Sequence, residues 1–187
     1  MKKLAKFLTI VLILSSIFFI LLKIIKIDDI IMKKMYPLKY TEYIERYAEE
    51  YDIDPYMVYA IIKAESNFNE YAESGSGAIG LMQVMEATAM ETAKKMELEI
   101  TEKELFEPEL NIRIGVKYFT DLLKKYENNY GISIVAYNAG IGNVDKWIET
   151  GVIKKDGTDL ENVPFKETNN YVRKIVRDYE IYKKLYE

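Results

Sequence analysis

The feature that most constrains this chain is an apolar run near its N-terminus. No charged side chain occurs from Phe7 to Leu22, a stretch of 16 residues, and the apolar character continues to Ile27. An α-helix rises about 1.5 Å per residue and the hydrocarbon core of a bilayer is roughly 30 Å thick, so this segment is long enough to cross a membrane. We predict a cytoplasmic tip and transmembrane signal-anchor over residues 1–27, a linker over residues 28–38 and a globular domain over residues 39–187.

A cleaved signal peptide and a buried helix of a soluble protein are the alternative interpretations of this run. No small-x-small cleavage site follows it, which argues against a signal peptide. A helix in a soluble core seldom lacks charge over so long a stretch. We therefore expect residues 7–27 to contact the membrane in a single pass. Lys2, Lys3 and Lys6 favour a cytoplasmic N-terminus and a globular domain on the outer side, although four lysines between residues 23 and 34 oppose that orientation.

The composition excludes several classes of catalytic site. Histidine and cysteine are both absent, so the chain has no imidazole base, no thiolate nucleophile and no zinc site built from these residues. A carboxylate is therefore the leading candidate for an acid or base near neutral pH, ahead of Lys and Tyr. Apolar residues make up 49% of the chain, which predicts a packed domain and not a disordered protein.

Charge is unevenly distributed along the chain. Residues 1–35 contain seven Lys and two Asp, a net charge of +5, whereas the whole chain carries −4. The remaining residues therefore carry a net charge of −9. Because nucleic acids are polyanions, we expect no nucleic-acid partner for so acidic a domain.

Beyond residue 36 the apolar pattern is that of helices. Apolar residues recur at spacings of three and four within residues 44–51, 57–62, 111–126 and 168–186. Asp54 followed by Pro55 predicts a helix start, and Thr101 followed by Glu104 predicts a capping box before a short helix. No segment shows the strong alternation of a strand, and glycine-rich turns separate the helical patterns. We predict one mainly α domain of about 150 residues, large enough for a single core.

The segment from Gly75 to Gly80 spells the G-x-G-x-x-G string of dinucleotide-binding proteins. That motif requires a preceding strand and a following helix within a βαβ unit. Here a predicted helix precedes the string. We therefore expect no nucleotide cofactor, and nothing in the sequence requires a metal ion.

Glu65 is the most informative carboxylate. It follows Val58, Ile61 and Ile62 at spacings of seven, four and three, so it continues their apolar face and is expected to point inward. It also lies near the C-terminal end of its predicted helix. Burial and the negative end of the helix dipole both disfavour the charged carboxylate and raise its pKa, as a general acid near neutral pH requires. From position alone, a structural carboxylate capped by neighbouring amides is an equally good interpretation.

Tyrosines are a second signal, since the chain contains 16 of them. Tyrosine suits sugar binding because its face packs on apolar ring edges while its hydroxyl group bonds the polar rim. Most of these residues lie on helical stripes and are expected in the core or on the surface. Tyr137 precedes a glycine turn in the string Ala-Tyr-Asn-Ala-Gly and is the better candidate for a cleft.

Glu65 and Tyr137 belong to a set of four sequence blocks that follow one another along the chain. They are Glu65–Phe68 with Ser74 and Gly77–Gln83, Leu105–Ile112 with Gly115, Ala136–Gly140 with Gly142 and Val144, and Pro164–Thr168 with Tyr171 and Val172. These blocks, within about residues 51–182, resemble the soluble-lytic-transglycosylase (SLT) domain, a family that acts on peptidoglycan. Four ordered blocks are far more specific than a single G-L-M-Q string. The resemblance implies a mainly α, lysozyme-like SLT domain behind one N-terminal transmembrane helix.

The resemblance also implies an activity. A lytic transglycosylase cleaves the β-1,4 bond between N-acetylmuramic acid and N-acetylglucosamine without water and leaves a 1,6-anhydromuramic acid end. Glu65 would be the catalytic acid and base. The implied substrate-binding residues are Ser74, Gly80, Met82, Gln83, Tyr137, Asn138 and Glu167. Gly80 would let the backbone approach the sugar, because it has no Cβ.

The implied partner is the glycan strand of peptidoglycan. The domain is then expected to face the cell wall from the cell membrane, without cofactor or metal. The chain departs from the family at Glu70 and Glu86, where members often carry proline. Both positions are expected in a loop or at a helix start, so these departures should have small backbone effects and leave the chemistry unchanged.

Three alternatives remain beside this activity. A hydrolytic muramidase of the same fold would need a second carboxylate, for which Glu70, Glu73 and Glu86 are candidates only by proximity in sequence. A non-catalytic glycan-binding module would not need Glu65, so the presence of this residue argues against that alternative. A membrane-anchored helical interaction domain would explain the apolar run but not the four blocks.

Overall fold

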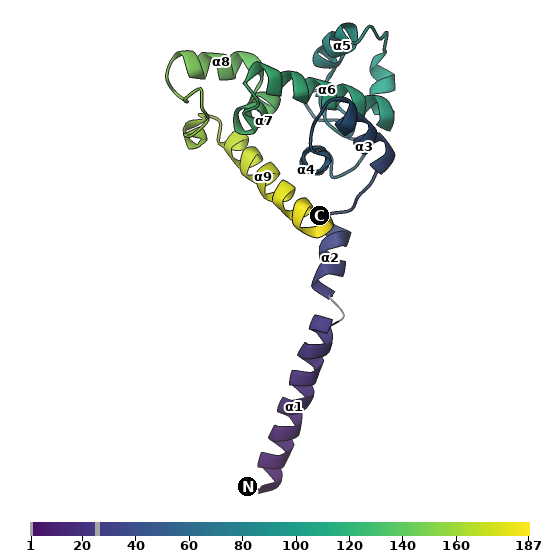
Figure 1. Cartoon of the computed structure of the whole chain (residues 1–187), viewed down its shortest axis with the longest axis vertical. Coiled ribbons are helices and arrows are strands. Elements are labelled where there is room, and N and C mark those ends of the chain that lie inside the picture. The colour runs from purple at the N-terminus through teal and green to yellow at the C-terminus, as the bar shows by residue number, and fades with distance from the viewer. Residues whose placement is uncertain (1, 25–26) are drawn as a thin grey trace. The chain divides into compact units, whose positions relative to one another are not determined.

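The computed structural model describes residues 2–24 and 27–187, and it divides into the units Met1–Pro37 and Leu38–Glu187. The α-helices are α1 (Lys2–Ile24), α2 (Ile27–Met35), α3 (Thr41–Glu50), α4 (Pro55–Glu65), α5 (Glu86–Lys95), α6 (Pro108–Lys125), α7 (Tyr130–Ala139), α8 (Ile141–Glu149) and α9 (Lys166–Tyr186) (Figure 1). The remaining elements are the strands β1 (Ala78–Ile79) and β2 (Val84–Met85) and the short 3-10 helices η1 (Glu102–Phe106) and η2 (Leu160–Asn162).

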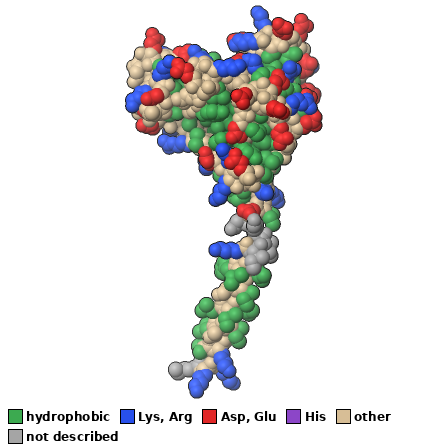
Figure 2. All heavy atoms as spheres, in the orientation of Figure 1, with side chains coloured by type: hydrophobic (Ala, Val, Ile, Leu, Met, Phe, Trp, Pro, Cys, Tyr) green, Lys and Arg blue, Asp and Glu red, His purple; other side chains and the backbone are tan. Residues whose placement is uncertain are grey.

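In the first unit, the uncharged run from Phe7 to Leu22 lies within α1, whereas residues 25 and 26 of the predicted span lie outside the described residues. The segment Lys2–Lys23 has a mean hydropathy of 2.5, and it is long and apolar enough to cross a membrane. Its apolar side chains are exposed, for example Leu12 at 67% and Phe19 at 66%, and Figure 2 shows hydrophobic side chains along the outside of this helix. A helix with an apolar outer surface all round is typical of a membrane span. The helix α2 occupies most of the segment that the sequence predicts as a linker.

In the second unit, α4 is the central helix. It begins where the sequence predicts, because the side chain of Asp54 accepts a hydrogen bond from the Tyr56 amide at 2.8 Å and Pro55 is the first helical residue. Six consecutive residues from Met57 to Ile62 are buried, since α3 packs on one side of α4 and α9 packs on another (Figure 1). The helix α9 also packs against α7, so it joins α4, in the first half of the domain, to α7, in the second half.

The prediction of a mainly α domain is confirmed, with differences at element ends. The capping box is present, since the Thr101 amide donates to Oε2 of Glu104 at 2.7 Å, but the helix that it starts is of the 3-10 type. The helix α6 starts at Pro108, earlier than its apolar stripe, because proline is favoured at the first helical position. The last helix likewise starts two residues early, at Lys166.

The domain contains a small hairpin that the sequence pattern did not predict. The strands β1 and β2 pair antiparallel, with Ala78 opposite Met85 and Ile79 opposite Val84. Two-residue strands are too short to show the alternation by which strands are recognised. The hairpin lies within the segment that joins α4 to α5, residues 66–85, which we call the α4–α5 loop. The G-x-G-x-x-G string belongs to this loop and follows a helix, as predicted.

Candidate functional site

Glu65 is the last residue of α4, and its carboxyl group meets α9. The hydroxyl group of Tyr171 donates a hydrogen bond to Oε1 of Glu65. Burial raises the pKa of Glu65 from 4.5 to about 7, while the Tyr171 hydrogen bond and the positive charge of Lys174 oppose that shift only in part. The raised pKa agrees with the direction expected from the sequence. Near neutral pH the carboxyl group is therefore present both with and without its proton, which suits a group that donates and then accepts one.

Two tyrosine side chains lie around this carboxyl group. The hydroxyl group of Tyr137 donates to the main-chain oxygen of Met82 at 2.7 Å. Burial, followed by the charge of Glu65, raises the pKa of Tyr137 and of Tyr171 well above the usual value. Both hydroxyl groups therefore stay protonated and act as donors near neutral pH. The helices α4, α7 and α9 and the α4–α5 loop thus meet at Glu65.

The α4–α5 loop is held in place by a buried amide. Asn111 on α6 is fully buried, and its Oδ1 accepts a hydrogen bond from the Met82 amide at 2.8 Å. Its Nδ2 donates to the main-chain oxygens of Ile79 and Leu105 at 2.9 and 2.8 Å. Because each polar atom of this side chain has a partner, the amide can stay in the core and fix the loop. The main-chain oxygen that receives the Tyr137 hydrogen bond is positioned in this way.

Gly80 is needed for this arrangement, for a reason that differs from the expected one. Its φ is +77°, and a Cβ there would lie 2.3 Å from Nδ2 of Asn111 and 2.7 Å from the main-chain oxygen of Leu105. The space left by the missing side chain is thus filled by Asn111 and by protein backbone, not left open for a sugar. Gly80 permits the close packing of the loop on α6.

Three other predicted substrate-binding residues belong to the α4–α5 loop, and their side chains contact other parts of this loop or the core. The hydroxyl oxygen of Ser74 accepts hydrogen bonds from the amides of Ala78 and Ser76, at 2.9 and 3.3 Å. The side-chain nitrogen of Gln83 donates to the main-chain oxygens of Ala72 and Gly80, both at 3.0 Å. The Met82 side chain is fully buried and packs against Gly115. These contacts indicate that the three residues shape the loop.

The last two predicted residues lie where α7 meets α9. Oδ1 of Asn138 accepts a hydrogen bond from the Thr168 hydroxyl group at 2.7 Å, which ties the two helices together. Glu167 is exposed in the first turn of α9, four residues before Tyr171, and therefore on the same side of that helix. The structure thus brings Tyr137 and the Met82 main chain to Glu65 and places Asn138 and Glu167 at the neighbouring helix junction.

No role was predicted from the sequence for Tyr171, Lys174 or Asn111. Tyr171 belongs to one of the four blocks, and Lys174 follows it by three residues, so the two share a helix face. Asn111 precedes Gly115 and Phe119 by four and eight residues, which places an amide on a buried apolar stripe. A polar side chain on such a stripe is the signal that could have identified it.

The carboxylates considered as a second acid have other environments. Oε2 of Glu70 accepts a hydrogen bond from the Tyr40 hydroxyl group at 2.9 Å. Glu73 forms an isolated β-bridge with Ile79, and Glu86 is exposed at the start of α5. Within the described residues, none of the three is among the groups that shift the pKa of Glu65, and no group of acidic side chains is arranged to hold a metal ion.

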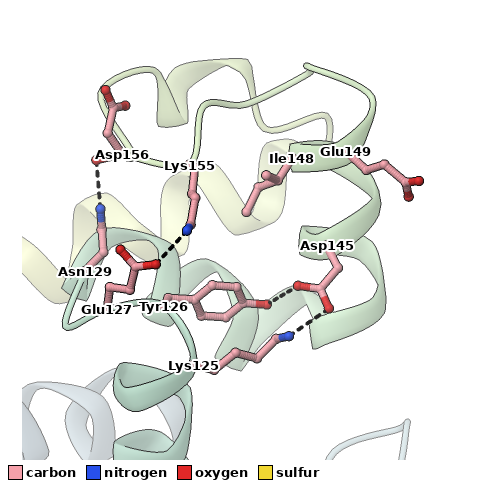
Figure 3. Close-up of a pocket in the computed structure, with 9 residues that line it drawn as sticks. All are labelled: Lys125, Tyr126, Glu127, Asn129, Asp145, Ile148, Glu149, Lys155 and Asp156. Carbon is pink, nitrogen blue, oxygen red and sulfur yellow. Dashed lines mark hydrogen bonds and ion pairs between the residues drawn. The ribbon is translucent and has the colours of Figure 1, made fainter.

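Two pockets share Lys125, the last residue of α6. One, of about 490 Å³, is lined by Lys125, Tyr126, Glu127, Asn129, Asp145, Ile148, Glu149, Lys155 and Asp156 (Figure 3). Its charges largely pair with one another, as in Lys125 with Asp145 at 3.0 Å and Lys155 with Glu127 at 2.5 Å. The other pocket, of about 590 Å³, is lined by residues of α5, α6 and the α7–α8 junction, including Tyr118. The ring of Tyr118 packs on the ring of Tyr137, with the two ring centroids 5.4 Å apart, but neither Tyr137 nor Glu65 is among the residues that line this pocket.

Comparisons with known proteins agree with this geometry. Residues 42–158 match the family described as the transglycosylase SLT domain. The soluble lytic murein transglycosylase of Escherichia coli (strain K12) is 34% identical over 154 residues, which cover 81% of this chain and 24% of that protein. The membrane-bound lytic murein transglycosylase C of Edwardsiella ictaluri is 38% identical over 117 residues, or 57% of this chain and 32% of that protein.

Solved structures lead to the same family. An inactive mutant of the lytic transglycosylase Slt from Pseudomonas aeruginosa superposes with a TM-score of 0.75 and 30% identity, over 82% of this chain and 25% of the other. The 70-kDa soluble lytic transglycosylase of Escherichia coli gives a TM-score of 0.74 and 31% identity over the same shares. The chain therefore spans about a quarter of the length of these relatives. By family match, sequence identity and fold, this chain belongs to the SLT-domain transglycosylase family.

Proposed function

We propose that this chain is a membrane-anchored lytic transglycosylase that cleaves the β-1,4 bond between N-acetylmuramic acid and N-acetylglucosamine in peptidoglycan. Membership of the SLT family supports this activity, as do the lytic murein transglycosylases that cover most of the chain. The buried carboxyl group of Glu65 supports it on chemical grounds, since its pKa is about 7.

In the proposed reaction Glu65 acts twice. The protonated carboxyl group first gives its proton to the glycosidic oxygen as the bond to C1 of the muramic acid breaks. The C6 hydroxyl oxygen of the same sugar then bonds to C1, and the Glu65 carboxylate takes the proton from that hydroxyl group. The products are a 1,6-anhydromuramic acid end and a free N-acetylglucosamine hydroxyl group, so no water is consumed.

The surroundings of Glu65 favour this route over hydrolysis. A glycosidase that uses two carboxylates holds them about 5–5.5 Å or 6.5–9.5 Å apart. A second carboxylate so close would raise the pKa of its partner by charge repulsion. Among the described groups, the pKa of Glu65 responds to burial, Tyr171 and Lys174 and to no other carboxylate. The single carboxyl group is the observation that carries the proposal.

The proposed substrate-binding residues contribute in two ways. Ser74, Gly80, Met82 and Gln83 shape the α4–α5 loop beside Glu65. Tyr137, Asn138 and Glu167 line the path of the glycan along α7 and the start of α9. The pocket at Tyr118 extends that path, because its aromatic face and hydroxyl group are suited to a sugar ring.

The proposed location follows from α1. Residues 1–27 form a cytoplasmic tip and a single membrane span, residues 28–38 form the tether and residues 39–187 form the catalytic domain outside the cell membrane. This arrangement would keep the domain within reach of the cell wall. The length and composition of α1 support it, and so does the lysine cluster that precedes the apolar run.

The test is a mass analysis of the products that the full chain, solubilised in detergent, forms from purified peptidoglycan. We expect anhydromuramyl ends, which are lighter by one water than hydrolysed ends. The Glu65→Gln variant should bind glycan and form no product, whereas Glu86→Gln, at an exposed site, should form the same product as the parent. Hydrated ends would instead identify a muramidase, and binding without cleavage would identify a glycan-binding module.

A second readout does not depend on cleavage. The 70-kDa soluble lytic transglycosylase has been solved in complex with bulgecin A. If this chain has the same kind of glycan cleft, bulgecin A should raise its melting temperature. The absence of any shift, together with the absence of cleavage, would contradict the proposed function.

A further inference from the structure

Lys174 is a half-buried lysine whose ammonium group reaches from α9 to the end of α4. Its Nζ donates a hydrogen bond to the main-chain oxygen of Ala64 at 2.8 Å, and Ala64 immediately precedes Glu65. We propose that Lys174 is a positioning residue for Glu65, which holds the last turn of α4 and supplies the positive charge beside its carboxyl group. This inference rests on the proposed function, in which Glu65 is the acid and base.

The end of α4 needs hydrogen-bond donors from outside the helix. The last four carbonyl groups of an α-helix lack partners within the helix. The amides of Ser66 and Asn67 return to the oxygens of Ile62 and Lys63, at 3.0 and 3.2 Å. The next main-chain oxygen, that of Ala64, accepts its hydrogen bond from the ammonium group of Lys174 on α9. Lys174 therefore completes the hydrogen bonding of the turn that carries the carboxyl group, as cationic side chains do at helix C-termini.

Positive charge is the second contribution of Lys174. Burial and the negative end of a helix both disfavour a carboxylate at this position. The groups that face Glu65 are Tyr171 and Lys174 from α9 and Tyr137 from α7, and Lys174 is the charged one among them. Its ammonium group therefore offsets part of the cost of ionising Glu65, which must happen once in every turnover.

A single helix, α9, supplies both Tyr171 and Lys174. Tyr171 and Lys174 are three residues apart on α9, so their side chains leave the same face of the helix. One face of α9 therefore gives Glu65 a hydrogen bond and a compensating charge. Displacement of α9 would remove both at once.

Other charges near Lys174 do not replace it. On α4 its charged neighbours are Glu65 and Lys63. Burial lowers the pKa of Lys63, Asp178 opposes that shift and the charge of Lys174 adds to it. Lys63 is not among the groups that shift the pKa of Glu65, so among the described lysines Lys174 is the one that supplies positive charge to that carboxyl group.

The test compares three substitutions in the full chain. Lys174→Met removes the hydrogen bond and the charge, Lys174→Gln offers an uncharged donor, and Lys174→Arg keeps a positive charge. Lys183→Met is the matched control, because Lys183 lies on the same helix and pairs with Glu187 at 3.3 Å on the surface. Circular dichroism verifies that each variant is folded.

The decisive measurement is a carbon-13 NMR titration of the Glu65 carboxyl group, with its signal assigned by its loss in Glu65→Gln. We expect the titration midpoint to rise by about one pH unit in Lys174→Met and Lys174→Gln, and to stay near that of the parent in Lys174→Arg and Lys183→Met. The basic limb of the cleavage rate against pH should move upward with it. An unchanged midpoint in both uncharged variants would overturn the inference, whatever their cleavage rate.

The two proposals can fail separately. The titration needs no substrate, so a shifted midpoint in a chain that cleaves nothing would retain the assignment of Lys174 and reject the proposed function. Cleavage with an unshifted midpoint would retain the proposed function and reject the assignment of Lys174. A parallel loss of melting temperature in Lys174→Met and Lys174→Gln, without any change in the titration, would reduce Lys174 to a helix cap.

Discussion

The hydroxyl group of Tyr171 donates a hydrogen bond to Oε1 of Glu65, which joins two residues that are 106 positions apart in the chain. Glu65 ends α4, and Tyr171 lies on α9, the last helix of the domain. The environment of the proposed catalytic carboxyl group therefore exists only when α9 is packed against α4. Chemistry and folding are linked at this contact.

Removal of the Tyr171 hydroxyl group should slow cleavage without weakening substrate binding. In Tyr171→Phe the ionised form of Glu65 loses a donor, and a hydrogen bond to a charged group contributes about 1.5–3 kcal/mol, so kcat should fall about tenfold or more. The KM should change little, and the basic limb of the pH profile should move upward because the lost hydrogen bond had lowered the pKa of Glu65. Steady-state kinetics on purified peptidoglycan measure all three quantities.

Tyr126→Phe is the control for this substitution. The Tyr126 hydroxyl group donates to a carboxylate oxygen of Asp145 at 3.0 Å in the pocket of Figure 3, and neither residue is among the groups that shift the pKa of Glu65. Its loss should lower stability to a similar extent and leave kcat unchanged. An equal fall of kcat in both variants would mean that the effect of Tyr171 is only structural.

The raised pKa of Glu65 predicts a stability that depends on pH. The folded-state pKa is about 7 against an ordinary value of 4.5, so folding favours the protonated form. The stabilisation is complete below the unfolded-state pKa and is lost as the pH rises through the folded-state value. A shift of this size corresponds to about 3 kcal/mol at 1.36 kcal/mol per unit.

Glu65→Gln should remove this dependence, because an amide does not ionise. We expect the variant to be about 2–3 kcal/mol more stable than the parent at about pH 8.5 and within about 1 kcal/mol of it at about pH 4. Urea unfolding followed by the fluorescence of Trp147, the single tryptophan, provides the measurement. Equal stability of the two chains across this range would contradict the burial of Glu65.

The glycines of the α4–α5 loop should respond unequally to alanine. Gly77 and Gly80 have φ values of +82° and +77°, but a Cβ at Gly77 meets nothing within 4 Å, whereas at Gly80 it meets Asn111. Gly77→Ala should cost about 1–2 kcal/mol from backbone strain alone. Gly80→Ala adds overpacking and should cost about 3–5 kcal/mol. Similar costs for the two variants in urea unfolding would mean that Asn111 can move aside.

The orientation of the anchor can be measured with single cysteines, because the chain has none of its own. Lys184→Cys, exposed on α9, should react with a membrane-impermeant maleimide when the cytoplasmic membrane is intact and the layers outside it have been made permeable to the reagent. Leu4→Cys, near the N-terminus, should react only after the cytoplasmic membrane is lysed. The reverse pattern would place the globular domain inside the cell.

Much of the architecture could be predicted from local patterns. The helix of α1 follows from a run without charge, and the start of α4 follows from Asp54 and Pro55, because such signals depend on residues that are neighbours in the chain. The hairpin of the α4–α5 loop was missed, since its strands are too short to carry a periodic pattern. The starts of α6 and α9 were misplaced by three and two residues, because an apolar stripe marks the buried face of a helix and not its first residue.

The sequence by itself determined the family and the helical character of the domain and singled out Glu65 as the candidate acid and base, because motifs and helical spacing record these features. Only the tertiary structure decided what surrounds the carboxyl group. Asn111, Tyr171 and Lys174 reach the α4–α5 loop or the end of α4 from other helices. Hydrogen bonds and charge act across space, so the groups that raise and moderate the pKa of Glu65 are known only when those helices are packed.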